Sequence, residues 1–127
     1  MDRLEHARAL RANKDKHYNC CQSVLVPFAK EMGMTEDQAY ALGAHFGSGI
    51  RHGSACGAFV GSMMVLGALG YDQEQALAHI RQFKSAHGDT ACSVLLKTAH
   101  DQGIPRTEHC DGLVYEMVEA LELLLQK

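Results

Sequence analysis

Prolines, β-branched residues and surplus basic residues are all scarce in this sequence, and each scarcity narrows what the chain can be. Proline occurs only twice in 127 residues, and no long stretch alternates polar and apolar residues as a β-strand does. Lysine and arginine number 12 against 15 aspartates and glutamates, for a net charge of -3. The sequence therefore predicts a helical protein without the basic surplus that binds nucleic acid or an anionic membrane surface.

No apolar segment is well suited to targeting or to crossing a membrane. The first residues, Met1–Arg8, are largely polar or charged, so no secretory signal is expected. The charge-free run Gly53–Tyr71 falls just short of the about 20 apolar residues that a bilayer core needs, and glycines interrupt it. Arg51, His52 and Asp72 flank this run closely. We therefore expect no membrane span and a cytoplasmic location.

The rest of the composition predicts one all-α domain over residues 1–127. Hydrophobic residues make up 46% of the chain, and no linker or low-complexity segment divides it. Capping boxes, each ending in a glutamine, begin at Asn19, Thr35 and Asp72, and Pro27 is expected to kink the helix in which it lies. These signals predict a bundle of about five to seven helices, over roughly 4–16, 19–32, 35–46, 56–69, 72–87, 90–103 and 107–125.

The helix expected over 56–69 is predicted to be the central and most buried element. It carries no charge and is apolar nearly all round. Because glycine costs a helix about 1 kcal/mol relative to alanine, Gly57, Gly61 and Gly67 indicate a compensating gain. We expect that gain to be the close approach of another helix or of a bound group. Gly53 lies on the same helix face as Gly57 and Gly61, since the three recur every fourth residue.

Four of the five cysteines fall near the predicted starts of four different helices: Cys20, Cys56, Cys92 and Cys110. The positive end of the helix dipole and the free N–H groups there favour the thiolate, which attacks disulfides and binds metals. No C-x-x-C pair is present, so helix packing has to assemble any site built from these residues. We expect at least three of them to meet. Cys56 is expected to have the lowest pKa, because Arg51 and His52 precede it.

Three kinds of chemistry remain open for this cysteine set. Two thiols can cycle between dithiol and disulfide. Four thiolates can instead hold an iron–sulfur cluster or a zinc ion, with His52 in the glycine-rich loop and His109 beside Cys110 as further candidate metal ligands. In the third interpretation the thiols are inert and the chain is a helical interaction module. The sequence has no dinucleotide-binding, phosphate-loop or serine-nucleophile motif.

Four cysteines in this order, with a Cys-Gly-Ala-x-x-Gly box at the second, resemble the C_GCAxxG_C_C family of redox-active proteins. The residues that carry the resemblance are Asn19, Cys20, the box from Cys56 to Gly61, Cys92 and Cys110. The resemblance covers about residues 18–120 and implies a redox function for the four cysteines. It also implies that Gly57, Ala58 and Gly61 lie where a cofactor would bind. Cys21 departs from the pattern, as either a spare ligand or a small core residue.

Together these observations predict a cysteine-based redox protein of the cytoplasm. As an enzyme it would be a thiol-dependent oxidoreductase, and its redox partner and any iron–sulfur or zinc cofactor are left open. The last predicted helix is rich in leucine, and Leu123 falls outside its main apolar face. Because a second apolar face often marks a partner surface, we expect a homodimer.

Overall fold

The fold is entirely α-helical in the part of the chain described by the computed structural model, residues 2–126. It confirms the predicted fold class. That part of the chain contains seven α-helices, two further short helical turns and no strand. The helices are α1 (Arg3–Ala12), α2 (Cys20–Leu25), α3 (Glu36–Leu42), α4 (Gly57–Ala68), α5 (Gln73–His87), α6 (Cys92–Asp101) and α7 (Arg106–Leu125). None of these helices is both long enough and apolar enough to cross a membrane.

Local capping fixes where most of the helices begin. The side chains of Asn19, Thr35 and Asp72 each accept a hydrogen bond from a backbone N–H three residues on, as the sequence predicted. The first helix is shorter than predicted. Asn13 takes an extended conformation, and its side chain accepts hydrogen bonds from the N–H groups of Asp15 and Lys16, which closes a turn and ends α1 at Ala12.

Proline changes the geometry of the second helix, as expected. At Pro27 the α-helix gives way to a tighter turn, η1 (Val26–Phe28), because proline has no N–H to continue the helical ladder. Every residue from 21 to 29 is buried. The prediction that the glycine-rich helix would be the most buried element is therefore wrong. Although α4 is central, Gly67 and Ala68 at its end are exposed.

Glycines allow α4 to pack directly on α2. A Cβ at Gly57 would lie 2.6 Å from the carbonyl oxygen of Phe46 and 3.3 Å from the backbone nitrogen of Cys21. At Gly61 it would lie 3.1 Å from the carbonyl oxygen of Cys21. The predicted close approach is thus confirmed for these two glycines. It is wrong for Gly67, where a Cβ would meet nothing within 4 Å.

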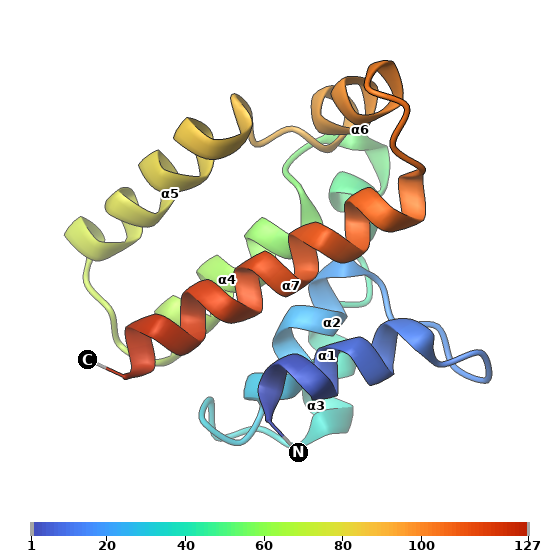
Figure 1. Cartoon of the computed structure of the whole chain (residues 1–127). Coiled ribbons are helices and arrows are strands. Elements are labelled where there is room, and N and C mark those ends of the chain that lie inside the picture. Colours follow the sequence, from blue (N-terminus) through green and yellow to red (C-terminus); the bar gives the residue numbers. More distant parts are fainter. Residues whose placement is uncertain (1, 127) are drawn as a thin grey trace.

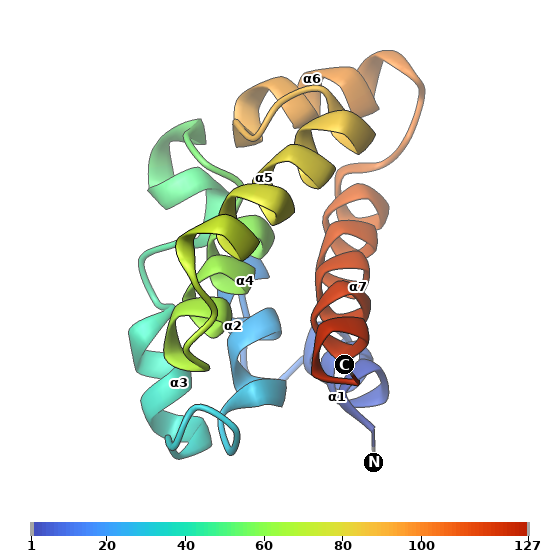
Figure 2. The same cartoon turned by 90° about the vertical axis from the view of Figure 1, so that its left-hand side faces the viewer.

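The core lies between α2, α4 and α7. In Figure 1, α7 runs across α4, with α1 and α2 beside it, and α5 and α6 lie at the edge of the bundle. The inner face of α7 buries Leu113, Val114, Met117, Val118 and Leu121, whereas Leu123 is 62% exposed. Figure 2 shows α6 at the end of the molecule where α7 begins. This end of the bundle carries the starts of several helices.

The outlying α5 is attached through two buried side chains, His79 and Phe83. Ser62 of α4 donates its hydroxyl hydrogen to the carbonyl oxygen of Phe59, and its oxygen lies 2.8 Å from Nε2 of His79. Because the single hydroxyl hydrogen is already used, His79 must be the donor in the second bond. Burial lowers the pKa of His79, so the neutral ring is favoured.

The glycine contact predicts opposite effects for two alanine substitutions in one helix. Gly57→Ala should lower the free energy of unfolding by about 1–3 kcal/mol, since its new methyl group meets backbone that cannot move alone. The matched control, Gly67→Ala, has free space and should raise the free energy by up to about 1 kcal/mol. Urea denaturation measures both. Equal effects would contradict the close packing of α4 on α2.

Acid should weaken the attachment of α5 through His79. The pKa of His79 is lowered in the folded protein, so the stability that its neutral form contributes is complete above the unfolded pKa of about 6.5 and is lost as the pH falls through the folded value. His79→Gln keeps an N–H donor but does not titrate. As the pH falls below about 6.5, the unfolding free energy of the wild type should therefore decrease relative to that of His79→Gln. A constant difference would show that His79 is not the titrating group.

Candidate functional site

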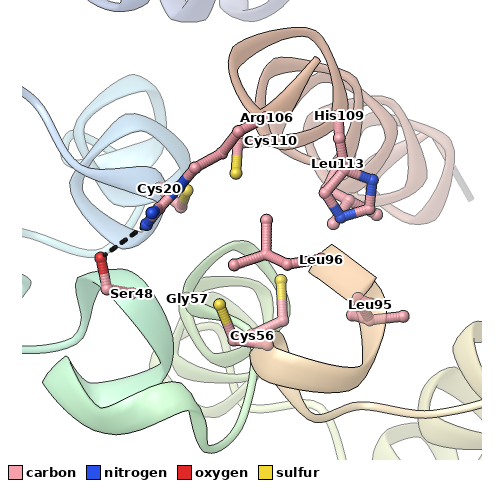
Figure 3. A pocket seen from close by; sticks show the side chains of 11 residues that line it. Cys20, Ser48, Cys56, Gly57, Leu95, Leu96, Arg106, His109, Cys110 and Leu113 are labelled. Atoms are coloured by element: carbon pink, nitrogen blue, oxygen red, sulfur yellow. Dashed lines mark hydrogen bonds between the residues drawn. The ribbon is translucent and has the colours of Figure 1, made fainter. Parts of the chain in front are cut away.

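All four predicted cysteines line one cavity, at the end of the bundle where α2, α4, α6 and α7 begin. Cys20 and Cys92 are the first residues of α2 and α6, and Cys56 directly precedes α4. Cys110 lies in the second turn of α7. Figure 3 shows Cys20 and Cys110 on one side of the cavity and Cys56 across from them. The structure thus brings together the set for which the sequence predicted that at least three would meet.

Backbone pairing holds Cys56 and Cys92 near each other. The segments before α4 and α6 meet in a single antiparallel bridge. The N–H of Cys56 donates to the carbonyl oxygen of Thr90 at 2.7 Å, and the N–H of Cys92 donates to that of Ser54 at 2.6 Å. The bridge pairs Ala55 with Ala91. Cys56 and Cys92 are the next residues of the two segments, so both side chains leave the bridge on the same face. The starts of α4 and α6 therefore lie side by side.

Cys20 and Cys110 form the second close pair, and it is the charged one. The pKa of Cys110 is lowered to about 6, chiefly by its interaction with the neighbouring Cys20 thiol, and the guanidinium groups of Arg11 and Arg106 add to this effect against the opposing effect of burial. The same interaction with Cys110, together with burial, raises the pKa of Cys20. These opposite shifts favour a thiolate at Cys110 beside a protonated Cys20.

Two arginines hold positive charge at this pair, and sequence reasoning found neither. Arg11 of α1 donates from Nε to Asp111 at 2.7 Å and from a terminal nitrogen to the carbonyl oxygen of Tyr18 at 3.0 Å. Arg106 lines the cavity and donates to the hydroxyl oxygen of Ser48 at 3.3 Å (Figure 3). Arg106 could have been found, since it precedes Cys110 by one helical turn and shares its face. Arg11 gave no such signal, because only the packing of α1 brings it here.

The expectation that Cys56 has the lowest pKa is wrong. Burial raises the pKa of Cys56, and the backbone N–H groups of Phe59 and Ala58, which favour the thiolate, do not outweigh it. The positive charge expected from upstream does not reach the sulfur. Arg51 is exposed and donates to the ring of His45 instead. Burial likewise raises the pKa of Cys92.

The departure at Cys21 is a packing feature. Its side chain is fully buried, and it packs against the α4 backbone at Gly61, outside the cavity that the other four cysteines line. Burial, with a smaller effect of Cys56, raises the pKa of Cys21 to about 12. Cys21 is therefore a neutral thiol that fills the tight contact between α2 and α4.

One comparison with known proteins bears on this cysteine arrangement. A family model described as "Putative redox-active protein (C_GCAxxG_C_C)" matches residues 18–124. The chain belongs to this family. No curated protein and no solved structure matches it significantly. The resemblance drawn from the cysteines and the glycine box is thus confirmed and extends slightly further along the chain than predicted.

The residues of the family's box divide between the site and the core. Gly57 lines the cavity. Gly61 faces α2, and Ala58 is fully buried away from the cavity lining. The box of the C_GCAxxG_C_C family thus positions Cys56 in this chain chiefly by letting α4 begin against α2.

The glycine-rich loop forms one wall of the cavity in a strained conformation. Three residues that are not glycine have left-handed backbone angles: Ser48 (φ 51), Ile50 (φ 55) and Arg51 (φ 64). Such conformations cost about 1–3 kcal/mol each and persist only where surrounding structure holds them. Within the turn η2 (Gly49–Gly53), a Cβ at Gly49 would lie 2.6 Å from the Cβ of Cys92, so this wall closes tightly on the cysteine.

Of the two histidines considered as metal ligands, only His109 lines the cavity, and His52 is exposed outside it. Burial, with the nearby charge of His87, lowers the pKa of His109 and favours its neutral ring. Within residues 2–126, no three histidine, cysteine or acidic side chains are grouped closely enough to hold a metal ion. The arrangement is thus closer to two thiol pairs than to a preformed four-ligand centre.

The charge distribution predicts the order in which the thiols react. With the reduced, metal-free protein near pH 7, iodoacetamide should modify Cys110 first, because it is the thiol whose pKa is lowered, to about 6. Cys20→Ala removes the donor and should raise the apparent pKa of Cys110 measured from alkylation rates against pH. Peptide mass spectrometry identifies the modified residue. Earlier modification of Cys56 would contradict this assignment.

Proposed function

We propose that the protein is a thiol-based redox protein in which Cys110 and Cys20 cycle between dithiol and disulfide. One observation carries the proposal: Cys20 and Cys110 line one cavity together with Arg106, and the guanidinium groups of Arg11 and Arg106 favour a thiolate at Cys110. Membership of a family described as redox-active supports the same conclusion.

The geometry favours Cys110 as the attacking thiol and Cys20 as the resolving one. A thiolate is the nucleophile in thiol–disulfide chemistry, and a thiol whose pKa lies near the ambient pH attacks most effectively. As Cys20 forms the disulfide with Cys110, two electrons pass to an acceptor and the Cys20 proton is released. A reducing compartment such as the cytoplasm would return the pair to the dithiol.

A metal centre is the second candidate function, and it is favoured by the presence of all four cysteines on one cavity. Four thiolates are the usual ligands of an iron–sulfur cluster and also suit zinc. To hold either, Cys20, Cys56, Cys92 and Cys110 would have to move closer to a common point. The disulfide proposal needs only two of these residues, Cys20 and Cys110, to come together, so we prefer it.

Oxidation of protein purified without air separates the two functions. Diamide should form a Cys20–Cys110 disulfide, detected by peptide mapping, and Cys20→Ser or Cys110→Ser should each abolish it. Cys21→Ala is the matched control, since its thiol lies outside the cavity, and it should leave the disulfide unchanged. Brown, iron- and sulfide-containing protein, or stoichiometric zinc, would favour the metal centre. Failure of diamide to link Cys20 to Cys110 would reject the dithiol proposal.

A further inference from the structure

The free space beside the Cys110 sulfur is small. The cavity has a volume of about 30 Å³, and one water needs about 10–15 Å³. Leu95, Leu96 and Leu113 form apolar parts of its wall. A substrate held wholly inside this space is therefore close in size to a few waters, whereas larger reagents reach the partly exposed Cys110 from outside it. A protein disulfide is far larger than this space.

Arg106 places hydrogen-bond donors next to the same sulfur. Its guanidinium lines the cavity with Cys110 and lowers the pKa of that thiol, and one terminal nitrogen donates to the hydroxyl oxygen of Ser48 at 3.3 Å. A guanidinium has five N–H donors in a fixed plane, so the contact with Ser48 leaves further donors for an oxygen atom bound beside Cys110. The strained loop holds Ser48 in a left-handed backbone conformation. Ser48 in turn orients the guanidinium of Arg106.

We propose that the acceptor of the Cys110–Cys20 pair is a small hydroperoxide, with hydrogen peroxide as the smallest member of the class. This inference rests on the proposed function and adds the substrate to it. Arg106 is then a catalytic residue, because its N–H groups stabilise the negative charge that develops on the departing oxygen.

The reaction balances with the groups that are present. The Cys110 thiolate attacks one oxygen of the hydroperoxide, an S–O bond forms as the O–O bond breaks, and the departing alkoxide or hydroxide takes the proton of the Cys20 thiol. Cys110 is now a sulfenic acid. The Cys20 thiolate attacks its sulfur, the S–S bond forms, and the S–O bond breaks to release hydroxide, which takes a proton from solvent. The two thiol sulfurs are oxidised to a disulfide. An organic hydroperoxide is reduced to one alcohol and one water, and hydrogen peroxide is reduced to two waters.

The rate of disulfide formation tests this substrate class. Hydrogen peroxide should oxidise the reduced protein at least about tenfold faster than free cysteine at the same thiolate concentration. Cumene hydroperoxide, which is much bulkier, should react more slowly than hydrogen peroxide. Formation of the Cys20–Cys110 disulfide is followed by quenched-flow alkylation and peptide mapping.

Substitution of Arg106 separates a direct effect on the peroxide from an effect on the thiolate. Above the pKa of Cys110 in both proteins, Arg106→Gln should slow the peroxide reaction by about tenfold or more and change the iodoacetamide rate at Cys110 much less. Arg106→Lys should be intermediate, because it keeps the charge but loses the planar donors. Arg81→Gln, an exposed arginine on α5, is the matched control and should change neither rate.

The outcomes distinguish the substrate from the function on which it rests. If diamide forms the disulfide but hydrogen peroxide reacts no faster than with free cysteine, the hydroperoxide proposal is wrong and the dithiol pair stands. Equal slowing of the peroxide and iodoacetamide reactions in Arg106→Gln would overturn the role of Arg106. If neither oxidant links Cys20 to Cys110, both proposals fall.

Discussion

The direct contact between the backbones of α2 and α4 is the constraint on which the rest of the structure depends. It exists because Gly57 and Gly61 have no side chain where α2 and the carbonyl oxygen of Phe46 approach. With the two helices this close, Cys20 and Cys56 begin them at the same end of the bundle. The long helix α7 packs on both (Figure 1), and it carries Cys110 to that end. A larger distance between α2 and α4 would move the sulfurs of Cys20 and Cys56 apart.

Burial and charge, rather than position at a helix start, decide which thiol ionises. Cys56 lies at the start of α4, where helix amides favour a thiolate, yet burial outweighs them and raises its pKa. Cys110 lies one turn further into its own helix, but it has a thiol donor and two guanidinium groups beside it, and its pKa is lowered to about 6. At Cys56 the backbone N–H groups at the start of α4 are thus weaker than burial.

The difference between local contacts and contacts from distant elements explains how much of this protein the sequence predicts. Capping boxes at Asn19, Thr35 and Asp72 act within one helical turn, so the helix starts and the all-α class follow from local residues. The cysteine set also follows from the sequence, since the glycine box marks it. Ionisation depends on side chains that arrive from distant elements, as Arg11 does from α1, and no local pattern reports such contacts. The packing of Gly67 was mispredicted for a related reason, because composition alone does not show which turn of a helix meets a neighbour.

In the proposed dithiol–disulfide cycle, the position of Arg11 links the redox state of Cys110 and Cys20 to the docking of the N-terminal helix. α1 precedes the stretch that the family model matches, yet the charge of its Arg11 lowers the pKa of Cys110 and opposes the rise in that of Cys20 while Arg11 donates to Asp111. A disulfide has no negative charge, so oxidation removes one of the attractions that hold α1 in place. Thermodynamic reciprocity then requires the converse. A docked α1 stabilises the reduced form and raises the reduction potential, and release of α1 makes the same two sulfurs a stronger reductant.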